Sequence, residues 1–303
     1  MPIPFDHFLG NAPIIRMLES LADHPGHAYL FHGADGLGKR LAARSFASKI
    51  LHVDNIDHLP AHPDFIALER EEGSKELKIK QTREFVSRMT MTSARGGFKV
   101  ALIPEADRLN EESANALLKS VEEPSGDSVF IFVTEQPDRL PATLRSRLAS
   151  IAFSPVPLAE LSGKFSAEFI RASRGCPGIA SRLQADPEAW ESRKRDAAAL
   201  IDIWATQPLG KELGEIERLY KRLQSEEDSE LAWRAILVEL MQVMPERIAA
   251  DPVAFSRIGR GLARAWNMIG SSLSPHLALE WSAIEPYIIG KRPLPDFLHP
   301  RYL

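Results

Sequence analysis

The chain has 303 residues, 44% of them hydrophobic and 26% charged, and its formal net charge at pH 7 is −4. This length allows two or three globular domains with a substantial core. The slightly negative balance excludes a general basic field for nucleic acid, so any DNA contact must be local or shared with partners. The single cysteine, Cys176, excludes an intrachain disulfide framework. Because neither a signal-peptide pattern nor an apolar run of about 20 residues occurs, we expect a cytoplasmic protein.

Short apolar runs alternate with helical patterns in the first half of the chain. We expect strands over residues 27–31, 64–68, 100–103, 129–133 and 150–153. The segment 11–24 has helical spacing of apolar residues, and so does the segment after residue 40. Asn110 can cap a further helix that Pro124 stops. Strands that alternate with helices predict a five-stranded parallel α/β domain that ends near residue 154.

Helical patterns continue from Pro157 to the end of the chain, without a strong strand signal. They are broken near prolines at 187, 208, 245, 252 and 275. Two apolar stripes have helical spacing: Leu237, Leu240, Met241 and Met244, and then Phe255, Ile258, Leu262, Trp266 and Ile269. These stripes indicate the core faces of helical bundles.

A glycine-rich loop follows the first expected strand and precedes a helix. Its glycines, Gly33, Gly36 and Gly38, are followed by Lys39 in the pattern G-x-x-x-x-G-K of a P-loop. Backbone N–H groups and the helix N-terminus of such a loop bind phosphate, and the lysine adds a point charge. The alternative is that the glycines only form a tight turn between strand and helix.

Both groups that would orient a magnesium ion at this loop are missing. The position after Lys39 should be Ser or Thr, whose hydroxyl coordinates Mg²⁺, but it is Arg40. The acid that normally ends the next motif's strand is replaced by Pro104, whereas Glu105 and Asp107 remain. A guanidinium cannot ligate a cation. We therefore expect no hydrolysis, no required cofactor and no metal, although ATP or ADP binding at the loop stays open.

The stretch EADRLNEESANALLKSVEEP followed by PDRLPATLRSR resembles the clamp-loader branch of the AAA+ proteins. Within that branch it is most similar to the delta-prime subunits of the bacterial DNA polymerase III clamp loader. Four pieces occur in order: the glycine-rich loop, the acidic strand end, the ANALLK…EEP helix and the pair Ser146-Arg147. The resemblance covers roughly residues 5–185. It implies an AAA+ domain over 1–154 with a degenerate nucleotide site, a small helical lid over 155–206 and a helical collar for oligomerisation over 207–303.

The resemblance implies a non-hydrolysing subunit of the complex that loads the sliding clamp onto primed DNA during DNA replication. Such a subunit has no ATPase activity of its own but belongs to a DNA polymerase holoenzyme. Its partners are ATPase subunits of the gamma/tau type and a delta-type subunit in a hetero-oligomeric ring. Arg147 is implied as a finger that acts in trans on a neighbour's γ-phosphate, whereas Arg139 and Arg145 are less specific. An ordinary surface arginine paired with an acid is the alternative for Arg147.

Further departures and alternatives bear on the site. Gly178 stands where active relatives carry the sensor-2 arginine. Delta-prime proteins usually carry a four-cysteine zinc module, but this chain has no cysteine in that region. His52, His58, His62 and aspartates are the alternative zinc ligands, but their spacing matches no common pattern, so we expect no zinc. The alternative function is an active AAA+ ATPase that uses Lys39 and Glu105. A P-loop kinase would need catalytic acids that the sequence does not supply, and a DNA-binding factor would need excess positive charge.

Overall fold

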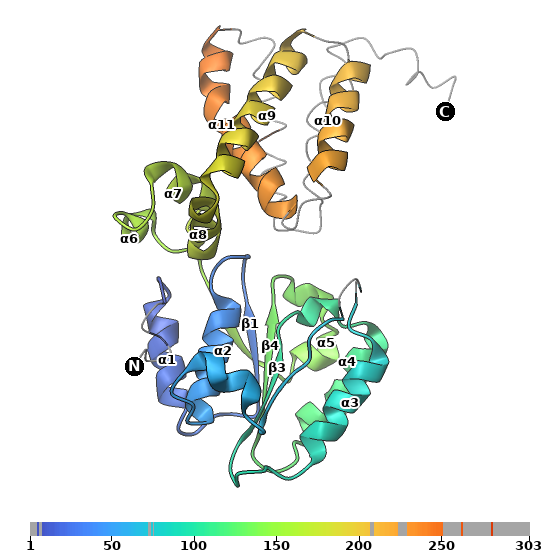
Figure 1. The fold of residues 1–303 in the computed structure, drawn as a ribbon. Helices are drawn as coiled ribbons and strands as arrows, with labels where there is room; N and C mark the ends of the chain where they lie inside the picture. The colour runs from blue at the N-terminus through green and yellow to red at the C-terminus, as the bar shows by residue number, and fades with distance from the viewer. Residues whose placement is uncertain are drawn as a thin grey trace, which may run out of the picture. The chain divides into compact units, whose positions relative to one another are not determined.

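The computed structural model describes residues 5, 8–71, 74, 76–206, 209–223, 229–250, 262 and 280. The chain divides into two compact units, Met1–Gly178 and Ile179–Leu303, and each is described by itself (Figure 1). Among the described residues, no helix is long and apolar enough to cross a membrane.

The first unit is built on a sheet of five parallel strands in the order β2-β3-β4-β1-β5. The strands are β1 (Ala28–His32), β2 (Phe65–Ala67), β3 (Lys99–Ile103), β4 (Ser128–Thr134) and β5 (Ala149–Ala152). The expected five-stranded parallel sheet is therefore confirmed, with strand ends shifted by at most one residue. β3 and β4 are buried along their whole length, which explains their continuous apolar sequences.

Helices cover both faces of this sheet (Figure 1). One face carries α1 (Ala12–Leu21) and α2 (Lys39–Ile50), and the other carries α3 (Ile79–Thr90), α4 (Glu111–Glu122) and α5 (Ala142–Arg145). Three short 3₁₀ helices complete the connections: η1 (Ile56–Ala61), η2 (Ala106–Arg108) and η3 (Pro137–Arg139). The unit ends with α6 (Leu158–Leu161), α7 (Ala167–Ser173) and the first turn of α8 (Pro177–Ala185).

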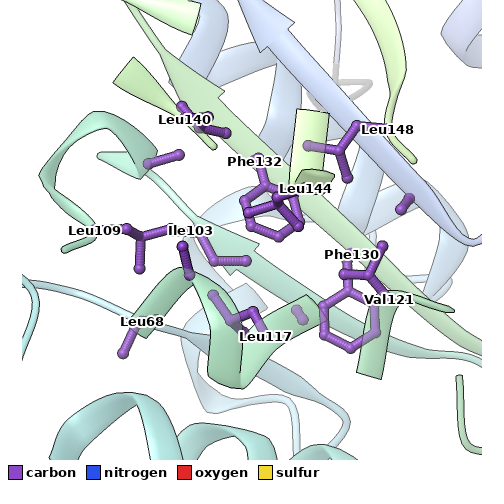
Figure 2. Close-up of a cluster of buried hydrophobic side chains, with 14 of the residues drawn as sticks. Leu68, Ile103, Leu109, Leu117, Val121, Phe130, Phe132, Leu140, Leu144 and Leu148 are labelled. Carbon is purple, nitrogen blue, oxygen red and sulfur yellow. The ribbon is translucent and has the colours of Figure 1, made fainter. Parts of the chain in front are cut away.

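A hydrophobic cluster fills the space between the sheet and the helices α3 to α5 (Figure 2). Phe130 and Phe132 of β4 point to the side of the sheet where Leu117 and Val121 of α4 lie. All four are 0 to 6% exposed. Full burial of such a side chain contributes about 1.5–3 kcal/mol, so this cluster stabilises the packing of the helices on β3 and β4.

Aromatic residues pack on the opposite face of the sheet. Phe31 of β1 lies next to Phe46 of α2 and Phe153 after β5, with ring centroids 6.3 and 5.5 Å apart. Phe46 is fully buried. This packing holds α2, whose first residue is Lys39, against the end of β1.

The described part of the second unit is helical. It contains the rest of α8 and three long helices, α9 (Pro187–Thr206), α10 (Leu209–Leu223) and α11 (Ser229–Ala250). Both α10 and α11 contact α9. No strand occurs in residues 179–206, 209–223 or 229–250, and the expected break at Asp186-Pro187 separates α8 from α9.

The expected break near Pro245 is wrong, because α11 continues through this proline. A proline inside a helix costs about 3 kcal/mol or more. Leu240 and Met244 are buried next to Pro245, and packing of this kind can offset the lost hydrogen bond. The second expected stripe lies outside the described residues except for Leu262, which is buried. The division at residues 154 and 206 stays a prediction.

Candidate functional site

The loop between β1 and α2 has backbone conformations that favour glycine. Gly33, Gly36 and Gly38 have φ angles of 138°, 74° and 80°. A residue with a side chain is strained in this left-handed region, so the backbone conformation of the loop by itself favours glycine at these three positions. Gly38 is the N-cap of α2, so the loop ends directly at the N-terminus of this helix. The predicted strand, loop and helix are confirmed as local structure.

Lys39 is bound to its own loop. Its side chain is almost fully buried, with the residue 6% exposed, and Nζ donates a hydrogen bond to the carbonyl of Ala34 at 2.6 Å. Burial lowers the pKa of the Lys39 ammonium, and the nearby acids Glu135 and Asp35 oppose this shift. The ammonium therefore stabilises the loop directly. A phosphate would have to compete with the Ala34 carbonyl for it.

Glu105 is paired with two arginines. It follows β3, and its Oε1 lies 3.5 Å from Nη2 of Arg40 while its Oε2 accepts a hydrogen bond from Nε of Arg70 at 3.0 Å. Arg70 also donates to the carbonyl of Ser74, which ties it to the segment after β2. The sequence marked Arg40 as a departure from the metal-binding pattern and Glu105 as a residue of the alternative, an active ATPase. It did not mark Arg70, because no motif indicates an arginine after this strand.

The second acid of this segment, Asp107, is a hydrogen-bond acceptor. Its Oδ1 accepts from Oγ1 of Thr134 at 2.9 Å, and Thr134 is the buried last residue of β4. The sequence did not mark Thr134 either, although its position at the carboxyl end of a parallel strand is a signal for a site residue. The bond joins the ends of β3 and β4 at the edge of the sheet where the glycine-rich loop begins.

Arg147 lies just after α5 on the surface of the first unit. Its Nη1 donates to the carbonyl of Thr143 at 2.6 Å, and its Nη2 forms an ion pair with Glu122 at the end of α4. The Arg147 side chain remains 40% exposed. Arg145 pairs with Asp138 instead, and Arg139 is exposed. The guanidinium of Arg147 is thus held by a carbonyl and an acid of its own chain and stays partly exposed.

The segment around Gly178 contacts the glycine-rich loop. The amide of Gly178 donates to the carbonyl of Gly36 at 2.8 Å. Cys176 is buried and lies close enough to Lys39 to influence the pKa of that ammonium. The position that carries an arginine in active relatives therefore makes a main-chain contact in this chain.

The segment before β2 contains three histidines, His52, His58 and His62. His62 is buried, and its Nδ1 accepts a hydrogen bond from the amide of Asp64 at 3.2 Å. Within the described part of the chain, no three His, Cys, Asp or Glu side chains are grouped so that they could hold a metal ion. The sequence prediction of no zinc stays a prediction, since residues outside that part are not covered.

Comparisons with known proteins agree with the arrangement of strands and motifs. A family model described as DNA polymerase III, delta subunit, matches residues 11–157. The chain is 36% identical over 182 residues to DNA polymerase III subunit delta′ of Pseudomonas aeruginosa, which covers 52% of this chain and 55% of that protein. It is 27% identical over 282 residues to DNA polymerase III subunit tau of Salmonella typhimurium, with 78% and 44% covered. The matches thus span about half the length of these relatives.

A solved structure with the same fold is that of a DNA polymerase III gamma subunit-related protein from Thermotoga maritima. Its TM-score is 0.50 at 15% sequence identity, and the match covers 89% of this chain and 97% of that one. At this identity the likeness supports the fold alone. The likeness agrees with the five-stranded parallel sheet of the first unit.

Proposed function

Residues 11–157 of this chain belong to the family described as DNA polymerase III, delta subunit, and on this premise we propose that the chain is a non-hydrolysing clamp-loader subunit of the delta-prime type. Its partners are gamma/tau-type ATPase subunits and a delta-type subunit in a hetero-oligomeric ring in the cytoplasm. Through that ring it acts on the sliding clamp and primed DNA in DNA replication. The similarity to a delta′ subunit supports this role.

The pairing of Glu105 with Arg40 and Arg70 carries the non-hydrolysing part of the proposal. Phosphoryl transfer in P-loop proteins depends on a metal ion that neutralises the developing charge. In this chain, a guanidinium pairs with Glu105 from the position of the metal-binding hydroxyl. To act on a water molecule, the carboxylate would have to leave both arginines. The retained loop is therefore a structural element in this proposal.

Arg147 is the group that the subunit supplies to its neighbour. A finger must be exposed, charged at all pH values and held in a defined direction, and a guanidinium meets these demands. The bond to Thr143 and the ion pair with Glu122 support a defined direction, and the 40% exposure leaves donors accessible. Exposed ion pairs contribute only about 0–1 kcal/mol, so Glu122 can be exchanged for a phosphate at little cost.

The experiment that tests this function is reconstitution of the complex with Arg147→Ala. We expect assembly to be unchanged and clamp loading to fall, because a finger supplied in trans contributes about 10³–10⁵ to the rate at its site. Total ATP turnover should fall only in part, since only the site that faces this subunit loses its finger. Arg147→Lys should restore little, because lysine keeps the charge but lacks the planar fork.

The matched control is Arg139→Ala, which removes another exposed arginine from the neighbouring η3. We expect this variant to load clamps like the unmodified complex. The finger assignment is wrong if complexes with Arg147→Ala hydrolyse ATP and load clamps normally. A loss of activity with Arg139→Ala as well would indicate a general basic surface instead.

A further inference from the structure

The glycines of the loop between β1 and α2 are packed against other main-chain and aromatic atoms of the first unit. A Cβ atom on Gly33 would lie 2.5 Å from the carbonyl oxygen of Phe153, and one on Gly38 would lie 2.8 Å from the ring of Phe8. Both glycines are therefore required by contacts within the protein, in addition to any contact with phosphate.

The closest approach to Gly36 is made by Gly178, the second residue of α8. Its amide donates to the Gly36 carbonyl at 2.8 Å, and a Cβ atom on Gly178 would lie 3.1 Å from both Cα and O of Gly36. The first amides of a helix have no partner within the helix, so this bond satisfies one of them. A methyl group at this distance would require one of the two backbones to shift by a few tenths of an ångström.

Hydrogen bonds also hold the segment after β5 and the segment before Gly178. The Asn11 side chain exchanges two hydrogen bonds of 3.0 Å with the amide and carbonyl of Ser154. The amide of Val156 donates to the carbonyl of Gly175 at 2.7 Å, and a Cβ atom on Gly175 would lie 2.4 Å from the Val156 carbonyl oxygen. Residues 154–156 and 175–178 are therefore connected to each other and to the loop by main-chain contacts.

Gly36 has little freedom to move away from Gly178. Its φ angle of 74° is already in the left-handed region. The loop is held on one side by the contact of Gly33 with Phe153 and on the other by the hydrogen bond from Lys39 to Ala34. A methyl group at position 178 would therefore strain the loop or break the hydrogen bond.

We propose that Gly178 and Gly36 form a main-chain latch that holds residues 154–178 on the glycine-rich loop without nucleotide. An arginine at position 178 would reach a bound phosphate with its side chain, so its contact would depend on that ligand. The Gly178–Gly36 contact consists of two peptide groups and depends on no ligand. This inference goes beyond the proposed function, because it concerns the start of α8 and does not involve Arg147.

Amide hydrogen exchange of the full chain tests the latch directly. In the natural sequence, we expect the Gly178 amide to exchange slowly, and equally slowly with and without MgATP. In Gly178→Ala, we expect the amide at 178 to exchange about three- to tenfold faster, the change that loss of one backbone hydrogen bond produces. Alanine is the better helix former, so helix propensity alone predicts the opposite sign.

Gly214→Ala is the matched control, because Gly214 lies in α10 and a Cβ atom there would meet nothing within 4 Å. We expect it to leave exchange at residue 178 unchanged. The latch is overturned if the Gly178 amide is protected only when MgATP is present, or if Gly178→Ala exchanges as slowly as the natural chain. If Gly178→Ala does not fold, exchange of the Gly178 amide in the natural chain with and without MgATP still tests the latch. None of these outcomes changes the result expected for Arg147→Ala, so the latch and the finger assignment can be disproved independently.

Discussion

At the scale of single residues, the pairing of Glu105 is the observation that supports a nucleotide site without ATP hydrolysis. Its oxygens lie 3.5 and 3.0 Å from nitrogen atoms of Arg40 and Arg70. The two guanidinium groups balance the charge of the carboxylate. They cannot replace a metal ion, because a guanidinium is a hydrogen-bond donor and does not coordinate phosphate oxygens and water as a metal ion does. Pro104 stands at the position where the P-loop pattern expects a metal-binding carboxylate. Recognition of Arg40 and Pro104 needed only the sequence, whereas Arg70 was found only from the folded chain.

We expect the isolated chain to hydrolyse ATP no faster than Lys39→Ala. Loss of metal stabilisation raises the barrier by several kcal/mol, which corresponds to roughly three or more decades in rate. Phosphate release with MgATP, with and without primed DNA, is the measurement. Steady turnover that Lys39→Ala abolishes would contradict the expectation and support the alternative of an active AAA+ ATPase.

At the scale of elements, local signals predicted α4 almost to the residue. Asn110 was expected as its cap, and its Oδ1 accepts a hydrogen bond from the amide of Ser113 at 2.9 Å, while the helix ends at Glu122 before Pro124. Such capping is a property of adjacent residues and can be read from the sequence. The pairing of Glu122 with Arg147 joins the end of α4 to the segment after α5. The continuation of α11 through Pro245 depends on packing. Neither has a local signal.

The loop between α3 and β3 provides a test at this scale. Asp64 is 1% exposed, and its carboxylate accepts hydrogen bonds from the amides of Ala94 at 2.6 Å and Arg95 at 3.1 Å. Burial alone would raise the pKa of Asp64, but these hydrogen bonds outweigh it and the pKa lies below its ordinary value. The ionised carboxylate therefore anchors the loop against the start of β2.

Asp64→Asn should lower the free energy of unfolding by about 1–3 kcal/mol at pH 7, because the new amide group faces a backbone donor that it cannot satisfy. The pKa of Asp64 is lower in the folded chain than in the unfolded one. Its contribution is therefore complete above the unfolded value of about 4 and is lost as the pH falls through the folded value. Urea unfolding from pH 7 to pH 3 measures the difference between the two proteins, which should shrink below about pH 4. A difference that stays constant with pH would contradict this role.

At the scale of the whole molecule, the sequence predicted the change from an α/β part to a helical part. Periodicity distinguishes strands from helices, so the end of the sheet after residue 152 was foreseen. Residues 155–178 group with the first unit, because main-chain contacts such as those of Val156 and Gly178 attach them to it. Contacts between peptide groups leave no mark in a sequence other than a glycine, and glycines have several other uses.

The thermal stability of the full chain should not respond to nucleotide. A ligand present at 100 times its dissociation constant stabilises the folded state by about 2.7 kcal/mol. In a domain of 150–250 residues, this would raise Tm by roughly 5–10 °C. Lys39 is already bonded to Ala34, and no residue at position 40 or 104 can hold Mg²⁺. We therefore expect MgATP and metal-free ADP to shift Tm by less than about 1 °C.

Lys39→Ala is the control, because nucleotide binding at the loop should depend on this ammonium. A rise of several degrees that disappears in Lys39→Ala would mean that the loop binds nucleotide and that Lys39 leaves Ala34 to do so.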